Sequence, residues 1–328
     1  MDWEKLAMSQ PIRPTNGFIR RVTMSGACLV LIAGLSSCKS EKTTGERPVQ
    51  KAFASPEEAG TAVLEAAKSG DQNALLAIFG PEASQVLFSG DPVQDKDALQ
   101  GFTAAYSQMH RWQQIKAGGE MLYVGADNFV FPIPLGQDQA GQWYFDTAAG
   151  KDEILARRIG RDELNAITAC AAIVQAEKEY FSRPRNGEKV KLYAERLVSD
   201  VGKQNGLYWS APAGQPPSPL EDARDFAKAL GYSSAGDKPQ LFEGYYFRIL
   251  TKQGDKAKGG AKDYVVDGKM TRGFAVLGYP AEYRVSGIMT FLVGEDAVVY
   301  QKDLGEKTTE AAAAMAAYDP SDGWVPAL

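Results

Sequence analysis

The chain has 328 residues, of which 44% are hydrophobic and 23% are charged, and its formal net charge at pH 7 is -5. This length is sufficient for two domains with hydrophobic cores of ordinary size. Nucleic-acid binding depends on basic surfaces that neutralise phosphates, so the acidic balance excludes a nucleic-acid partner.

The N-terminal segment has the pattern of a bacterial export signal. Arg20 and Arg21 precede an apolar run over 22–35, which is too short to cross a bilayer but is typical of a signal-peptide core. The residues LSSC at 35–38 resemble the lipobox of bacterial lipoproteins, whose cysteine carries a diacylglyceryl group after cleavage. We therefore predict a signal peptide over 1–37, lipidation of Cys38, and anchoring in the cell envelope, in the outer membrane facing the periplasm. A plain secretory signal that is cleaved elsewhere is the alternative.

The segment after Cys38 is polar, and 38–52 is predicted to be a tether between the membrane and the folded body. Of the three cysteines, Cys28 leaves with the signal peptide and Cys38 carries the lipid. Cys170 is then the single thiol of the mature chain, which excludes an intramolecular disulfide.

A first α+β domain is predicted over 53–150. The N-cap pattern SPEE at 55–58 starts a helix that ends before Gly70. A second helix is expected over 71–79, and a third from about Asp95 to Trp112. Short strands are then indicated by a period of two, at 121–127, 128–135 and 142–146. This order resembles the nuclear-transport-factor-like cone fold, which both ligand-binding modules and enzymes use.

A second α+β domain is predicted over 151–328. A short helix at 152–159, interrupted at Gly160, precedes a long helix over 163–181 that Asp162 caps. The apolar residues of the long helix fall on two neighbouring stripes, which are Leu164, Ile167, Ala171 and Val174, and Ala166, Cys170, Ile173 and Tyr180.

A proline-rich linker and a helix from Ser218 to about Gly231 follow the long helix. Strands at 244–251, 271–279, 287–293 and 297–303 are expected to form an antiparallel meander. The alanines of the long helix would let it approach this sheet closely. A last helix is expected over 306–318.

The second domain resembles the globular head of a type IV pilin or pseudopilin. The resemblance rests on NAITACAAIVQAEKEY at 165–180, on the strand beginning GYYF at 244–247, and on the strands at 273–280, 287–291 and 299–300. In pilins an apolar segment that builds the filament core precedes the helix, whereas KDEILARRIGRDE at 151–163 is charged. We therefore expect a pilin-like module that does not polymerise.

From residue 53 to the end, the chain is similar to domain-of-unknown-function family 2950, a family of bacterial envelope proteins. The supporting stretches are SPEEA at 55–59, SGDPV at 89–93, WYFDTAAGKDEILARRIGRDEL at 143–164, NGLYW at 205–209 and VVYQKDLG at 298–305. The family implies a location and a pairing of domains but no mechanism.

The chain has few residues suited to metal binding or to nucleophilic catalysis. His110 is the only histidine, and a zinc site or a Ser or Cys hydrolase needs further ligands or a base beside its nucleophile. We interpret His110 as a surface or capping residue and Cys170 as a small apolar filler. The sequence thus predicts no metal and no cofactor.

Carboxylates and arginines cluster where the two domains meet. They are Asp146, Glu153, Arg157, Arg158, Arg161, Asp162 and Glu163. In a glycosidase-like enzyme, two of the carboxylates would act as acid and base while arginines hold the substrate. In the structural interpretation, they form an ion-paired junction in which the end of a strand caps the next helix. The predicted aromatic recognition surface is separate, and consists of Tyr208, Trp209, Tyr245 and Tyr283.

The features together favour a non-catalytic, lipid-anchored binding or scaffold module whose partner is an envelope protein or a polysaccharide. The alternative is a cell-wall or polysaccharide hydrolase that uses the junction carboxylates. A third possibility, a small-ligand carrier, requires a deep apolar pocket lined by Phe129, Phe131 and Phe145.

Overall fold

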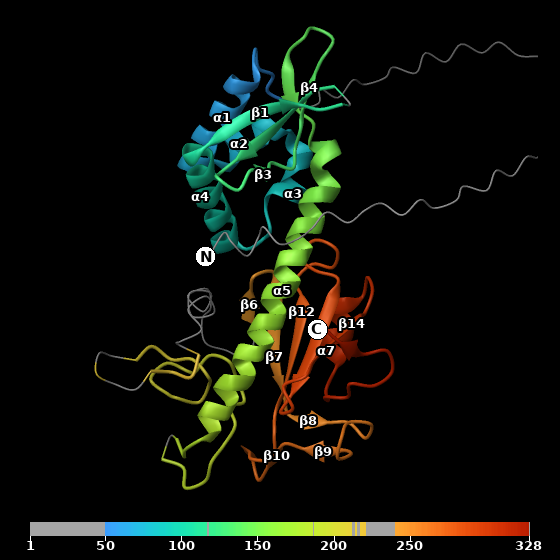
Figure 1. The fold of residues 1–328 in the computed structure, drawn as a ribbon. Coiled ribbons are helices and arrows are strands. Elements are labelled where there is room, and N and C mark those ends of the chain that lie inside the picture. Colours follow the sequence, from blue (N-terminus) through green and yellow to red (C-terminus); the bar gives the residue numbers. More distant parts are fainter. Residues whose placement is uncertain are drawn as a thin grey trace, which may run out of the picture.

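The computed structural model describes residues 50–327, except 117, 186, 212, 213, 215, 216 and 221–239. The predicted signal peptide, Cys38 and most of the tether lie outside these residues, as does most of the helix predicted from Ser218. The protein is of mixed α and β structure, with two lobes joined by the helix α5 (Thr147–Phe181) (Figure 1). At 1.5 Å per residue, its 35 residues extend over about 50 Å.

The first lobe begins with helices whose ends are set by local capping. The helices are α1 (Pro56–Ser69), α2 (Gln72–Phe79), the short η2 (Pro81–Ala83) and α3 (Ser84–Leu87), and α4 (Pro92–Gln108). The Ser55 hydroxyl accepts a hydrogen bond from the Glu58 amide at 3.1 Å, and Gly70 ends α1 in the left-handed conformation. Asp71 and Asp91 cap α2 and α4 in the same way.

The sheet of the first lobe is antiparallel, and four of its strands follow the order β1-β2-β4-β5, with β3 beside β2. The strands are β1 (His110–Gln114), β2 (Glu120–Val124), β3 (Phe129–Val130), β4 (Leu135–Gln137) and β5 (Trp143–Phe145). The predicted third helix over 95–112 is therefore wrong at both ends. It starts earlier because Asp91 caps it, and it ends earlier because Met109 is extended and Trp112 pairs with Leu122.

The predictions of a helix break at Gly160 and of a helix cap at Asp162 are wrong. Helix α5 runs without interruption through both residues. Gly160 lowers helix propensity by only about 1 kcal/mol relative to alanine, and packing along the helix outweighs that cost. The predicted boundary between the domains at 150 and 151 falls inside the first turn of α5.

The second lobe is built on a six-stranded antiparallel sheet with the order β15-β14-β13-β12-β7-β6. The strands are β6 (Gln240–Phe242), β7 (Tyr245–Leu250), β12 (Ala275–Pro280), β13 (Met289–Gly294), β14 (Val299–Asp303) and β15 (Val325–Pro326). The predicted meander is thus present at the centre of the sheet. Two small hairpins consist of β8 (Lys252–Gln253) with β9 (Lys262–Asp263), and β10 (Val265–Val266) with β11 (Lys269–Met270).

The C-terminal half of α5 lies along one face of this sheet (Figure 1). The buried stripe holds Ala166, Cys170, Ile173 and Tyr180, whereas Leu164 of the neighbouring stripe is 57% exposed. Helix α7 (Thr308–Ala314), shorter than the predicted 306–318, contacts β12. Within the described residues, no helix combines the length and apolar character that a bilayer crossing requires.

Candidate functional site at the lobe junction

The structure separates Asp146 and Glu163, two of the junction carboxylates considered for an acid/base pair. Asp146 caps α5 by accepting a hydrogen bond from the Ala149 amide at 3.1 Å. Glu163 accepts from the backbone amides of Ile288 and Met289 at 2.9 and 3.0 Å, at the start of β13. Because α5 rises 1.5 Å per residue, the two carboxyls are about 25 Å apart. They therefore cannot act on one substrate bond.

Glu153 and Arg157 form an ion pair of 2.6 Å within α5, on the side of the first lobe. The Arg157 guanidinium also donates to the Val130 carbonyl at 2.6 Å and lies 4.9 Å from the centre of the Phe129 ring. These contacts attach the helix to the first lobe.

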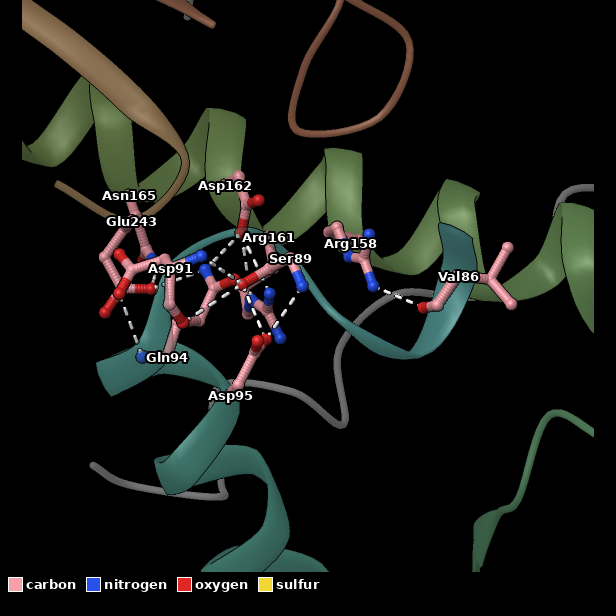
Figure 2. A network of polar contacts seen from close by, with 10 residues as sticks. All are labelled: Val86, Ser89, Asp91, Gln94, Asp95, Arg158, Arg161, Asp162, Asn165 and Glu243. Atoms are coloured by element: carbon pink, nitrogen blue, oxygen red, sulfur yellow. Dashed lines mark hydrogen bonds and ion pairs between the residues drawn. The ribbon is translucent and has the colours of Figure 1, made fainter. Parts of the chain in front are cut away.

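Asp162 is the centre of a polar network that joins both lobes to α5 (Figure 2). Its side chain is fully buried, and its Oδ1 accepts hydrogen bonds from Gln94 at 3.0 Å and from Arg161 Nε and Nη2 at 3.1 and 3.0 Å. The same Gln94 nitrogen donates to Glu243 at 2.9 Å. Asp162 and Glu243 are therefore bridged by one amide from the first turn of α4.

Arg158 is a second buried charge at this junction. It donates to the carbonyl of Val86 in the first lobe, while its Nη1 has no hydrogen-bond partner among the described residues. Burial lowers the pKa of Arg158, and the negative charge of Asp162 opposes that shift. The guanidinium thus interacts with the carboxylate network without bonding to it.

The electrostatics of Asp162 are unusual for a carboxyl. Burial raises its pKa to about 7, and this shift persists although the Arg161 charge lowers the pKa. The negative charge of Glu243 raises the pKa further. Because the side chain is fully buried, no substrate reaches it in this structure, so Asp162 is a junction residue and not an accessible general acid.

The turn between β6 and β7 brings Glu243 to the network. Glu243 and Gly244 both have positive φ, at 47° and 77°, as a two-residue type I′ hairpin turn requires. A Cβ on residue 244 would lie 2.7 Å from Asp162 Oδ2 and 2.9 Å from the Ser286 Cβ. Only glycine therefore lets this turn approach α5 so closely.

The family described as "Protein of unknown function (DUF2950)" matches residues 50–326 of the chain. The chain belongs to this family. No curated protein and no solved structure matches it significantly. Because the match covers both lobes and α5, the junction belongs to the unit that defines the DUF2950 family.

Sequence reasoning missed Gln94, which donates to Asp162 in this DUF2950 chain, and Glu243, which the same Gln94 amide bridges to Asp162. The helix start at Asp91 and Pro92 was a signal for the position of Gln94, and the EG dipeptide between apolar residues was a signal for the turn. No local signal shows that these elements meet, since Gln94 and Asp162 are 68 positions apart.

The predicted aromatic surface does not exist as a unit in this DUF2950 protein. Tyr245 is fully buried on the face of β7 that packs against α5, and its hydroxyl donates to the Met289 carbonyl at 2.8 Å. Trp209 is buried as well, with the Arg185 guanidinium 5.4 Å from its ring centre. Tyr208 and Tyr283 are half-buried, and Tyr283 donates to Asp303. Alternation along a buried strand therefore made Tyr245 a core residue.

The outer face of the first-lobe sheet carries accessible tyrosine and arginine side chains. Such a surface was predicted in the second domain and not here. Leu122 and Val124 point into the core, so the alternate residues of β2 and their partners on β1 face outward. Arg111 lies 4.2 Å from the centre of the Tyr123 ring and is held by Asn128. The outer-face residues that are exposed or half-buried are Arg111, Gln113, Met121, Tyr123 and Tyr144.

A groove of about 360 Å³ lies between the short helices of the first lobe and the first turn of α5. It is lined by Glu82, Gln85, Val86, Thr147, Ala148 and Lys151. None of the predicted site residues lines this groove. Among the described residues, no three His, Cys, Asp or Glu side chains are placed to hold a metal ion.

His110 is exposed and begins β1, where its ring stacks on Tyr106 at 4.0 Å and its Nδ1 lies 3.0 Å from the Tyr106 carbonyl oxygen. It thus contacts the last turn of α4. This arrangement agrees with a capping role.

Cys170 is expected to be inert in the folded protein. Its side chain is fully buried in the core of the second lobe, and burial raises the pKa of its thiol to about 12. In a chain whose Cys28 and Cys38 are replaced by serine, a thiol reagent should label Cys170 only at the rate of unfolding. Labelling within seconds at pH 8 without denaturant would contradict this assignment.

Proposed function

We propose that this DUF2950 protein is a lipid-anchored protein of the bacterial cell envelope that acts as a non-catalytic binding or scaffold module. The lipobox at Cys38 and the polar tether support the anchoring. The junction carboxylates support the absence of catalysis, because Asp146 and Glu163 bond to backbone amides and Asp162 is buried.

The folded body begins at Gln50, in the first lobe, and this position is consistent with attachment through an N-terminal tether. Gln50 donates to the carbonyls of Ile78 and Phe145 at 3.0 and 2.7 Å, so the chain enters at the first lobe. Residues 38–49, fully extended, would reach at most about 40 Å from the anchor. The first lobe would then be nearest to the membrane, and α5 would carry the pilin-like second lobe away from it.

The outer face of the first-lobe sheet is the observation that carries the binding role. Tyrosine and arginine are enriched among the few interface residues that contribute most of the binding energy, and holding such side chains rigidly before binding lowers the entropic cost of association. Asn128 and Tyr123 hold Arg111, and the Tyr144 ring lies against Gly136, whose added Cβ would be 3.2 Å away. This face therefore offers preorganised anchors to an envelope protein.

Two experiments test this proposal. Cys38→Ala should move the protein from the membrane fraction to the soluble envelope fraction, and retention in the membrane would contradict lipid anchoring.

In-cell photo-crosslinking tests the surface. A photoreactive residue at Gln113 should give one discrete adduct, and the same residue at Glu65, exposed on α1, should give none. Arg111→Ala and Tyr123→Ala should each weaken the adduct by about tenfold or more. The same bands from both positions, or no adduct at Gln113, would contradict a binding face here.

A further inference from the structure

A bridge between two carboxylates lies at the junction of the two lobes. Gln94 Nε2 donates to Asp162 Oδ1 at 3.0 Å and to Glu243 Oε2 at 2.9 Å. The three residues come from α4 in the first lobe, from α5, and from the β6–β7 turn in the second lobe (Figure 2). Asn165 also donates to Glu243, at 3.4 Å. One amide thus joins the lobes by holding two acidic groups near each other.

The second oxygen of Asp162 is the weak point of this bridge. Asp162 Oδ2 is buried and has no hydrogen-bond partner among the described residues. It faces Gly244, where a Cβ would be 2.7 Å away. Burying an ionised oxygen without a partner is strongly unfavourable, whereas a protonated carboxyl avoids most of that penalty.

The charged groups around Asp162 do not remove this cost. Arg161 bonds to Oδ1. The positive charge of Arg158 interacts with Asp162, but it also interacts with Asp95 and Glu282. Glu243 adds a negative charge from the facing turn, and Tyr245 and Glu163 lie on the side of the second lobe. Burial is the largest cause of the raised pKa of Asp162, about 7, and Glu243 adds to it.

We propose that the Gln94–Asp162–Glu243 bridge is a proton-dependent latch between the lobes, closed while Asp162 holds a proton and weakened when Asp162 ionises. Ionisation places a second negative charge beside Glu243 and leaves Oδ2 charged and unpartnered. Because α5 continues through the junction, the part that loosens is the contact of α4 with the β6–β7 turn. The latch would operate whichever partner the outer face binds.

The sign of the pH dependence follows from linkage. The folded pKa of Asp162 lies above its value in an opened or unfolded chain, so the closed state binds one more proton between about pH 4 and pH 7. The stabilisation is complete below about pH 4 and is lost as the pH rises to about 7. Above that pH the opening equilibrium should no longer change.

Hydrogen exchange of the full chain between pH 5 and pH 9, corrected for intrinsic rates, tests the latch. Protection of the peptides 91–97 and 240–247 should fall by up to about tenfold per pH unit below pH 7 and then level off. Protection of 56–69 in α1 should not change in this way. Constant protection of the two junction peptides from pH 5 to pH 9 would overturn the proposal.

Two variants assign the effect to Asp162. Asp162→Asn should keep the junction protected at every pH, because asparagine is neutral and similar in shape. The break point is the pH at which protection of the junction peptides stops falling. Glu243→Gln should move it below pH 7, while Glu153→Gln, exposed on the same helix, should leave it unchanged. A wild-type break point in Asp162→Asn would overturn the proposal. If Asp162→Asn does not fold, an unchanged break point in Glu243→Gln overturns it instead.

Discussion

Replacing Phe145 by alanine is expected to lower the free energy of unfolding of the first lobe by about 3–5 kcal/mol. Phe145 is fully buried, and its ring centre lies 4.7 Å from that of Phe79 and 6.0 Å from that of Phe131. Phe53 packs edge-on at 6.4 Å. The change would thus remove a ring around which the core of the first lobe is assembled. Urea denaturation followed by circular dichroism measures the loss.

Phe129→Ala is the control, because Phe129 is half-buried at the side of the sheet beneath Arg157. Replacing Phe129 should lower the free energy of unfolding by less than replacing Phe145 does. The comparison also tests the small-ligand carrier, which requires Phe129, Phe131 and Phe145 to line an open pocket. A loss below about 1 kcal/mol for Phe145→Ala would mean that the ring is not packed in a core.

Gly150→Ala and Gly160→Ala are expected to change stability in opposite directions, although both glycines lie in α5. A Cβ at residue 150 would be 2.7 Å from the Pro132 carbonyl oxygen and 3.0 Å from the Ile133 Cα. Backbone must move to admit it, and the variant should lose about 1–3 kcal/mol. At the exposed Gly160 nothing lies within 4 Å, so alanine should add about 0.5–1 kcal/mol through helix propensity.

Thermal and urea unfolding of the two variants measure this difference, and each variant is the control for the other. A helix that was broken at Gly160 would respond differently, since alanine there would then oppose the break. Destabilisation by Gly160→Ala would therefore contradict a continuous α5, and a neutral Gly150→Ala would contradict its close contact with the loop before β4.

The elements that could be predicted are those whose signals lie within a few residues. The caps at Ser55 and Asp71 and the glycine after α1 determine helix ends through bonds to the adjacent turn. The four central strands of the second lobe could be predicted because they are rich in β-branched and aromatic residues. Trp112 shows the limit of such patterns, because its strand is defined by pairing with Leu122.

The buried stripe of α5 shows why the candidate site could not be predicted in full. Asp162 and Glu177 lie on that stripe and are fully buried, so apolar periodicity alone does not reveal which face packs on the sheet. Leu164, which the pattern made a candidate for packing, is largely exposed. Tyr245 likewise became a core residue because its face of β7 turns toward α5.

The sequence by itself determined the class of fold, the family, and the positions of most helices and central strands, because capping, turn chemistry and alternation are local properties. The tertiary structure alone decided the role of each charged residue at the junction. Asp162 receives its environment from Gln94, 68 positions away, and Gln94 reaches Glu243 across 149 positions. Burial and the distances between charges determine the state of a carboxyl, and neither is a property of the local sequence.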